Sequence, residues 1–487
     1  MFLETENNIG NFSFQLQYNG NVDGIAIKKT TEDIVEQSFL PALERLLDKH
    51  SPPQNVVSID ELICEINIGA GDLNDRLAGK IMQQLEKLLL EKLVLVSDTE
   101  QPPTVEKRFA ETLLYYLENG YLPWWAAIST RQQLNELIIA LVESGIPAGT
   151  VEALLILLKR ETVVSRICND FEDATFWSFF KLLPGWADNS ITTAWQKDYL
   201  TFIAAEKPAS DKRPVSLLYK KSLLKSLSLY KANQLAFSLV EINKQFVNLF
   251  TAGVWLQFSS FNKNFAAAAV KLIDKIKNEE LKTTLALVGK RDSRTNEETS
   301  QKKEAGKPDQ AKEQADEPEN TPIKDAIYIN NSGLVIIAPY LGMFFRKVGI
   351  VKDDKITDLT KAITLLNYIS KGFDAFAEFE IVLPKLLCGL DVKDALKSRY
   401  MITGDDVAMI DELLSSVIAN WPILKNTSSD TLRSTFLLRD GKLTFKDNGQ
   451  HLKVQQNSLD VLLEHLPWNI SIVKLPWMKN ILYVEWV

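Results

Sequence analysis

The C-terminal tail, residues 465–487, constrains the fold of this chain more than any other stretch. It holds three tryptophans, two Leu-Pro-Trp triplets and two runs of strand-forming residues, at 470–473 and 481–487. Each proline fixes its own φ angle and keeps the leucine before it extended, so each triplet indicates the start of a strand or a corner. A chain end is usually polar, and this much apolar surface does not stay in water. We therefore predict that the tail closes the core of a folded domain, with docking of another protein as the alternative.

Length and charge narrow the class of protein. A chain of 487 residues, 46% hydrophobic and 24% charged, is long and apolar enough for about two to four domains with buried cores. The net charge of −8 argues against nucleic acid or an anionic membrane as a partner, since both are bound by basic surfaces. The acidic N-terminus has no signal sequence, and the longest apolar run, 333–345, is too short to span a bilayer. We therefore expect a cytoplasmic protein without a membrane span.

The fold class that the patterns predict is α+β and predominantly helical. Residues 1–98 are expected to form a small α/β unit. Alternating apolar and polar residues at 12–18 predict a half-buried strand, and 56–68 and 92–96 have strand-like sequences as well. An amphipathic helical pattern fills each of the two intervals between these strands.

The middle of the chain is expected to be a helical domain followed by a linker. In residues 105–290 the helical patterns are short, and glycines and prolines interrupt them repeatedly. Residues 291–320 contain no Ile, Leu, Val, Phe, Met, Tyr, Trp or Cys. Such a stretch cannot bury enough apolar surface to offset its conformational entropy, so we predict a disordered charged linker at 291–324.

The last domain, residues 325–487, is expected to combine helices with a small antiparallel sheet. Its helical patterns cover 332–347, 355–371, 391–398, 405–419 and 428–438. Strands are predicted at 442–445 and 452–455, joined by a hairpin at Asn448-Gly449, where both residues tolerate a positive φ. The strands of the tail would complete this sheet.

The residues with metal-binding chemistry do not form a ligand set. The three cysteines, Cys64, Cys168 and Cys388, lie far apart in mostly apolar surroundings, as is typical of buried reduced thiols. No two of the three histidines have the spacing of a helical ligand pair. We therefore expect no metal site and no cofactor.

Short strings that resemble catalytic motifs lack their companion residues. Gly69-Ala70-Gly71 has the strand-to-helix setting of a phosphate loop, but neither the third glycine nor a Gly-Lys-Ser/Thr string follows. Ser222-Leu223-Leu224-Lys225 has the Ser-x-x-Lys spacing without a second motif. We therefore predict no catalytic residue in either string.

Charged residues of the last domain have structural interpretations too. Asp405 or Asp406 fits the N-cap of the helix predicted at 405–419. Arg439 could contact an anion, but a structural ion pair is the preferred interpretation. An enzyme pocket built from Arg439, Asp405 and His465 is the remaining alternative, and nothing in the sequence assembles a nucleophile, a base and an oxyanion donor.

A set of ordered strings runs through most of the chain. The N-terminal strings are Ile59-Asp60-Glu61-Leu62 and Glu65-Ile66-Asn67-Ile68-Gly69. The central strings are Tyr116-Leu117, Gly120 and Leu122-Pro123-Trp124-Trp125. The C-terminal strings are Ser332-Gly333-Leu334-Val335-Ile336-Ile337, Lys385-Leu386-Leu387-Cys388-Gly389-Leu390, Trp421-Pro422, and the tail with Pro467-Trp468, Pro476-Trp477 and Trp486. Together they resemble the contractile injection system tape measure protein family, whose members belong to phage-tail-like particles.

The resemblance implies a structural part of a contractile particle that is associated with inner-tube length, and no catalytic residues. It implies tube, baseplate or cap proteins as partners and a place within the tube, and it does not specify an oligomeric state. The alternative is an adaptor or chaperone that loads cargo or nucleates the tube. The candidate structural or interaction motif is the set Leu122, Pro123, Trp124, Trp125, Trp421, Pro422, Pro467, Trp468, Pro476, Trp477 and Trp486.

A simple ruler would be a long helix or an extended chain, at about 1.5 or up to about 3.5 Å per residue. The folded-domain patterns at both ends and the helix breakers between them do not suit such a rod. Either the middle extends inside the tube, or the protein acts as a terminal plug or an assembly scaffold.

Overall fold

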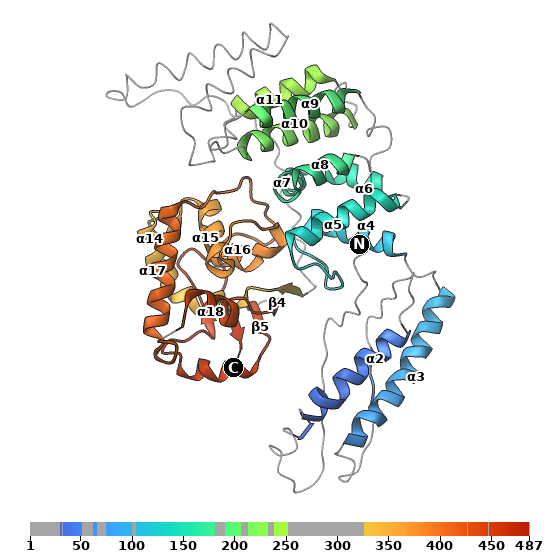
Figure 1. Cartoon of the computed structure of the whole chain (residues 1–487), viewed down its shortest axis with the longest axis vertical. Helices are drawn as coiled ribbons and strands as arrows, with labels where there is room; N and C mark the ends of the chain where they lie inside the picture. Colours follow the sequence, from blue (N-terminus) through green and yellow to red (C-terminus); the bar gives the residue numbers. More distant parts are fainter. Residues whose placement is uncertain are drawn as a thin grey trace. The chain divides into compact units, whose positions relative to one another are not determined.

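A computed structural model describes residues 30–31, 33–50, 62–65, 75–99, 104–147, 149–180, 190–205, 213–231, 238–251, 326–425, 427–446 and 448–486 (Figure 1). The chain divides into two compact units. The first takes in Met1–Leu113, Trp125–Ala127 and Ala140–Ala148. The second takes in Leu114–Trp124, Ile128–Ile139 and Gly149–Val487.

The first unit contains a helical pair. The π-helical turn η1 (Val35–Phe39) leads into α2 (Leu40–His50), and α3 (Asp75–Thr99) packs against both. Their shared core consists of the buried residues Ile34, Phe39, Leu43, Leu77, Ala78 and Ile81. This core alternates with exposed positions at helical spacing, which is what makes the pair amphipathic.

One predicted strand of the first unit is wrong. Residues 92–96 belong to α3, because no glycine or proline ends the helix and its leucines continue the helical pattern. The predicted strand 12–18 lies outside the described residues. Of the predicted strand 56–68, only 62–65 are described, and these four have no regular secondary structure.

Short helices fill the middle of the chain, as predicted, up to residue 251. They are α4 (Val105–Asn119), α5 (Arg131–Ser144), α6 (Thr150–Leu157), α7 (Glu161–Asp170), α8 (Asp173–Phe179), α9 (Ser190–Ala205), α10 (Arg213–Lys231) and α11 (Leu239–Thr251). Gly120 and Gly145 follow α4 and α5 with φ of 79° and 91°, a conformation that ends a helix and favours glycine. The rest of the predicted helical domain and the linker predicted at 291–324 lie outside the described ranges.

Residues 326–486, which belong to the second unit and which we call the C-terminal domain, combine helices with two small sheets. Its helical elements are η5 (Ser332–Ile337), α14 (Ala338–Lys347), α15 (Leu359–Lys371), η6 (Glu378–Ile381), α16 (Val382–Leu387), α17 (Gly404–Asn420), η7 (Pro422–Leu424), α18 (Ser429–Leu432), η8 (Arg433–Leu437) and η9 (Ser458–His465). Its strands are β1 (Ile327–Ile329), β2 (Val351–Lys352), β3 (Lys355–Ile356), β4 (Gly441–Lys446), β5 (Gly449–Val454), β6 (Ile472–Val473) and β7 (Leu482–Glu485). The α+β, predominantly helical fold class is thereby confirmed.

Two helix predictions in this domain need correction. The predicted helix 355–371 begins only at Leu359, because the side chain of Asp358 accepts a hydrogen bond from the backbone N–H of Lys361 and caps the helix there. Residues 391–398 form no helix. Their carbonyl groups accept hydrogen bonds from side chains of α7 and of Lys385, which the ladder of a helix would prevent.

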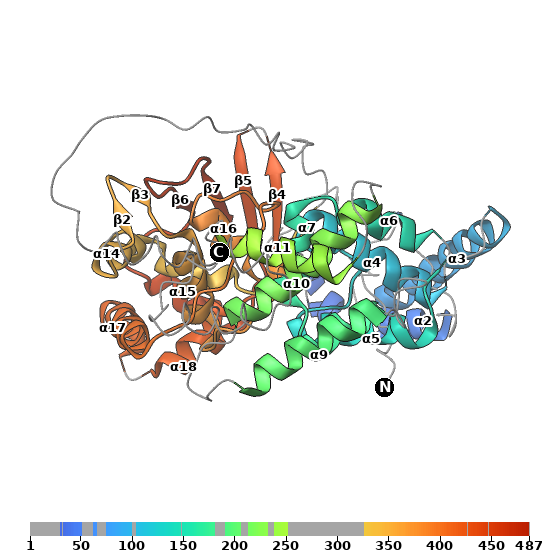
Figure 2. The same ribbon diagram turned by 90° about the horizontal axis from the view of Figure 1, so that it is seen from above.

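The main sheet is mixed, not antiparallel as predicted. Its strand order is β1-β4-β5-β7-β6, with β4 and β5 side by side in both views (Figures 1 and 2). The predicted β4–β5 hairpin is confirmed, with Lys446 opposite Gly449. β5 and β7 pair in parallel, because η9 and β6 lie between them in the chain and give it the length to return in the same direction.

The tail packs into the core of the C-terminal domain, as predicted. Leu475, Met478, Leu482 and Trp486 are buried in the same apolar cluster as Leu334. Within β7, the buried Leu482 and Val484 alternate with the more exposed Tyr483 and Glu485. The tail is therefore an interior layer of this domain.

Trp421 lies at the centre of this core and is fully buried. Its ring lies 4.8 Å from the ring of Phe436, and its indole Nε1–H donates to the carbonyl of Leu462 over 3.3 Å. It thereby ties the end of α17 to the turn that precedes the tail.

We predict that Trp421→Ala lowers the free energy of unfolding by about 3–5 kcal/mol, because it leaves a cavity in a packed core. Urea denaturation of the full chain, followed by circular dichroism, measures this. The matched control is Ile423→Ala, two residues away, whose side chain is 45% exposed and should change stability by less than about 1 kcal/mol. Equal effects of the two substitutions would contradict the assigned packing.

Candidate functional site

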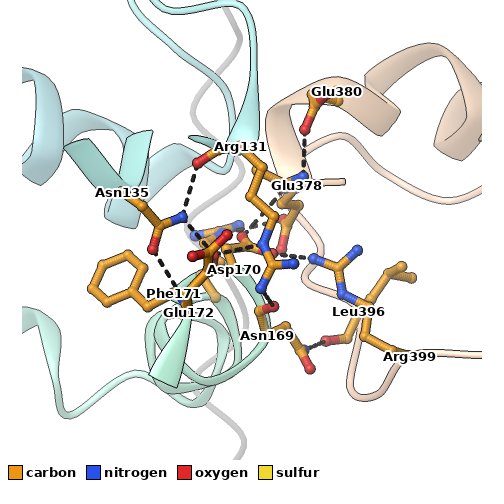
Figure 3. Close-up of polar contacts among 12 residues, drawn as sticks. Arg131, Asn135, Asn169, Asp170, Phe171, Glu172, Glu378, Glu380, Leu396 and Arg399 are labelled. Carbon is orange, nitrogen blue, oxygen red and sulfur yellow. Dashed lines mark hydrogen bonds and ion pairs between the residues drawn. The ribbon is translucent and has the colours of Figure 1, made fainter. Parts of the chain in front are cut away.

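A cluster of charged residues, four of them buried and the fifth half-buried, joins the short helices of the second unit to the C-terminal domain. We call it the buried junction and define it by Arg166, Asp170, Glu378, Lys385 and Arg399. The first two lie on α7 and the other three in the C-terminal domain, with Glu378 at the start of η6 and Lys385 on α16. Figure 3 shows Asp170, Glu378 and Arg399 turned toward one another across the two parts.

Glu378 stands at the centre of the buried junction. Its carboxylate atom Oε1 lies 3.1 Å from Arg166 Nε and 2.7 Å from Lys385 Nζ. All three side chains are buried, and Arg166 and Lys385 are fully so. One carboxylate therefore neutralises two cations that water does not reach, an arrangement that only close ion pairing makes tolerable.

Asp170 is the second anion of the buried junction. Its carboxylate accepts hydrogen bonds from the Tyr116 hydroxyl, from the Arg399 guanidinium and, over 3.2 Å, from the backbone N–H of Glu378. The Arg399 guanidinium also lies over the ring of Phe376, with Cζ 3.9 Å from the ring centroid. This carboxylate is thus bound from both parts of the second unit.

The cations of the junction outnumber its anions, and helix C-termini offset the difference. Arg166 Nη1 donates to the carbonyls of Leu117 (2.7 Å) and Glu118 (2.9 Å) in the last turn of α4. Arg131 Nε donates to the carbonyl of Asp170, the last residue of α7, over 2.9 Å. Unpaired carbonyls and the helix dipole give a helix C-terminus a partial negative charge, which stabilises guanidinium groups there.

The loop 391–398 completes the junction from the C-terminal side. Arg166 donates to the carbonyl of Lys393, and Asn169 Nδ2 donates to the carbonyl of Leu396 over 2.9 Å. Lys385 Nζ donates to the carbonyl of Val392 over 3.0 Å. Backbone carbonyls thus accept hydrogen bonds from N–H groups that the two carboxylates do not bind, so the charged groups of the junction have hydrogen-bond partners.

Gly120 is the residue that makes room for the central ion pair. With φ of 79° it follows α4, and its N–H donates to the carbonyl of Tyr116 over 2.7 Å. A Cβ at this position would lie 2.5 Å from Glu378 Oε1 and 2.7 Å from Arg166 Nη2. The site therefore requires glycine for its backbone conformation and for its lack of a side chain.

Burial dominates the electrostatics of the junction. Burial raises the pKa of Asp170, although the nearby Arg399 opposes this shift. Burial lowers the pKa of Lys385, which Glu378 opposes, and the pKa of Arg399, which Asp170 opposes. It also raises the pKa of the Tyr116 hydroxyl. Shifted pKa values often mark active sites, but here each group is bound by protein partners. The arrangement is that of a structural joint.

Each of the three tail tryptophans in the predicted motif donates a hydrogen bond to a different partner within the C-terminal domain. Trp468 Nε1 donates to the carbonyl of Ile336 over 2.9 Å, and Trp477 Nε1 to that of Leu387 over 2.7 Å. Trp486 Nε1 donates to Asp460 Oδ2 over 3.2 Å. The triplets therefore do not converge on one shared site.

The remaining members of the predicted motif differ in burial. Pro123 is buried, Leu122 and Trp124 are half-buried, and all three belong to the second unit. Trp125, in the first unit, is half-buried with the Arg108 guanidinium 5.2 Å from its ring centroid. The prolines that precede or follow the other tryptophans, Pro422, Pro467 and Pro476, are exposed.

Of the candidates for an enzyme pocket, Arg439 has an ion-pair partner, and Asp405 and His465 are exposed. Arg439 makes a two-point ion pair with Asp460, at 2.9 and 3.0 Å, so the preferred interpretation as an ion pair is confirmed. The predicted N-cap at Asp405 or Asp406 is wrong, because Thr403 is the N-cap of α17 and Asp406, at position N3, closes the capping box with it. No group of three or more His, Cys, Asp or Glu residues that could hold a metal ion occurs in the described part of the chain.

Some residues at the buried junction had already been singled out in the sequence. Tyr116, Gly120 and Lys385 belong to strings that carry the family resemblance, and they meet here. Arg166 and Glu378 belong to none of those strings. Their 212-position separation means that only the folded chain reveals the pairing.

The tryptophans of the core and the charges of the junction are thus bound by groups of the protein itself. The chain belongs to the contractile injection system tape measure protein family, whose family model matches residues 6–486. No curated protein and no solved structure matches the chain. None of the described helices is long and apolar enough to cross a membrane.

Removing the central charge of the junction should destabilise the second unit strongly. We predict that Glu378→Gln lowers the free energy of unfolding by about 3–5 kcal/mol, because Arg166 and Lys385 then remain buried without their anion. The measurement is urea denaturation followed by circular dichroism. The matched control is Glu118→Gln, which breaks the half-exposed Arg160–Glu118 pair (2.9 Å) and should change stability by about 0–1 kcal/mol. A similar small effect for both would show that the junction is not closed in solution.

The three thiols should differ in reactivity. Burial raises the pKa of Cys168 to about 12 and raises the pKa of Cys388 as well, so both thiols stay protonated and covered at neutral pH. Cys64 is only half-buried, so its thiol is more accessible to solvent, although burial raises its pKa too. We predict that iodoacetamide at about pH 8 alkylates Cys64 in the folded chain and the other two only after denaturation, as read by peptide mass spectrometry. Alkylation of Cys388 without denaturant would contradict the described core.

Proposed function

We propose that the chain is a non-enzymatic assembly component of a contractile injection system and takes part in setting the length of the inner tube. It is made in the cytoplasm, binds tube, baseplate or cap proteins of the particle, and is enclosed by the tube. The match of the family model to residues 6–486 carries this proposal. The predicted linker 291–324 serves as a tether of adjustable reach before the C-terminal domain.

The chemistry of the described residues supports a structural role. The carboxylates of the buried junction are ion-paired, and so is Arg439 in the core of the C-terminal domain. A general base or nucleophile needs an accessible, poised group in a cleft. The candidate motif supplies packing instead, since its tail tryptophans donate to backbone carbonyls or to the ion-paired Asp460.

A length-setting role requires more reach than the described helices have. The longest of them, α3, has 25 residues, which corresponds to about 37 Å at 1.5 Å per residue. If residues 99–324 formed one continuous helix, that helix would be on the order of 300 Å long. The length-setting proposal therefore includes an extended state of the middle of the chain inside the tube.

A second candidate function is favoured by the compact folding of the two units. An adaptor or chaperone that loads cargo or nucleates the tube needs folded binding domains and no extended state. The two functions predict different locations of the protein after assembly. A length-setting protein remains in the finished particle, whereas a chaperone associates with assembly intermediates only, and mass spectrometry of purified particles distinguishes them.

Length setting makes a quantitative prediction for residues 291–320, which contain no large apolar side chain. Deleting these residues should shorten the tube by about 45 Å if they are helical and by up to about 105 Å if they are extended, and duplicating them should lengthen it equally. Electron microscopy of particles from a producing strain measures the tube. The control is a scrambled segment of the same length and composition, which should leave the length unchanged. Unchanged length in the deletion and the duplication, with normal assembly, would refute length setting.

A further inference from the structure

We propose that the buried junction is a latch, closed in the free protein and open when the chain occupies the tube. This inference rests on the proposed length-setting function. It concerns a part of the chain to which the family resemblance assigns no role, the pairing of α7 with η6 and the loop 391–398.

The closed junction turns the middle of the chain into a loop. Arg166 and Glu378 are 212 positions apart in sequence, yet their side chains are 3.1 Å apart. Asn169 and Leu396 are 227 positions apart and are joined by a hydrogen bond of 2.9 Å. However long the intervening residues are, they cannot separate the two ends of this loop while the junction is closed.

Most of the residues that a ruler would need lie within this loop. They include α9, α10 and α11 and the predicted linker 291–324. Released and helical, a segment of 212 positions would reach on the order of 300 Å, but in the closed state it adds nothing to the separation of its ends. A role in measuring tube length therefore requires the junction to open.

The composition of the junction suits reversible opening. Separation would expose Arg166, Asp170, Glu378, Lys385 and Arg399, whose charges water solvates well. For buried ion pairs the desolvation penalty nearly offsets the mutual attraction, so opening to water is less unfavourable than for an apolar core of equal size. The junction therefore separates more readily than the apolar core of the C-terminal domain, in which Trp421 and Leu443 are fully buried.

Apolar contact across the junction is present too, and it acts together with the ion pairs to keep the latch closed in the free protein. The Tyr116 ring meets the Phe379 ring edge-on at 5.8 Å, and Tyr121 is buried in the core cluster of the C-terminal domain. A particle protein opens the latch only if it binds the separated parts more tightly than the closed form. Binding of tube or baseplate proteins to the exposed charges of α7 or η6 would provide that difference.

Photo-crosslinking in the full chain tests the latch. The photo-crosslinking amino acid p-benzoylphenylalanine replaces Lys397, which is exposed and adjacent to Leu396 at the junction. In the purified free chain we expect crosslinks to the α7 peptide. In particle-bound chain we expect this crosslink to be lost. The control position is Lys453 on β5, whose side chain pairs with Glu485 on β7, and its crosslink to the tail should persist in both states.

Each outcome decides between the latch and its alternatives. Loss at position 397 with retention at position 453 supports the latch. Retention at both positions overturns it, and length setting would then have to rest on residues outside the closed loop. Loss at both positions overturns it too, because the C-terminal domain itself would then have unfolded. Absence of the chain from purified particles overturns the length-setting function and, with it, the need for an open state.

The variant Glu378→Gln provides a positive control for the readout. In the free chain it should reduce the crosslink from position 397 and leave that from position 453 unchanged. If the crosslink from position 397 is undiminished in this variant, the ion pairs do not hold the junction closed, and the latch is overturned.

Discussion

The second unit depends on one carboxylate that holds two cations out of water. Glu378 pairs with Arg166 at 3.1 Å and with Lys385 at 2.7 Å, and its backbone N–H bonds to the other anion, Asp170. The surplus positive charge faces the carbonyl ends of α4 and α7. Two helix ends, two carboxylates and a loop of backbone carbonyls are thus needed together, because each alone would leave a buried charge unsatisfied.

The two kinds of core in this unit do different physical work. The C-terminal domain is held by apolar burial, in which Trp421 and the tail tryptophans supply large rings with one hydrogen bond each. The junction is held by ion pairs, which require a specific geometry. They contribute little net free energy, because the desolvation penalty offsets most of their attraction. A protein built this way has a domain that resists unfolding and a joint that defines one relative position of its parts.

The sequence was sufficient for features that depend on local pattern and insufficient for those that depend on distant pairing. Helical periodicity, the hairpin before Gly449 and the burial of the tail all follow from residues close in sequence. The helix predicted at 391–398 was wrong because its carbonyls serve distant donors, and the strand at 92–96 because nothing interrupts α3. The parallel pairing of β5 with β7 and the junction itself join residues whose proximity no local pattern encodes.

The place of β7 in the sheet has a consequence for the order in which the C-terminal domain forms. β7 lies between β5 and β6 and is synthesised after the other four strands of this sheet. While the ribosome still covers residues 482–485, β5 has an open edge and the buried face of the sheet lacks Leu482 and Val484. The domain therefore completes its core only after these residues emerge, so nascent chains would hold an unpaired strand edge that chaperones or particle proteins have time to bind.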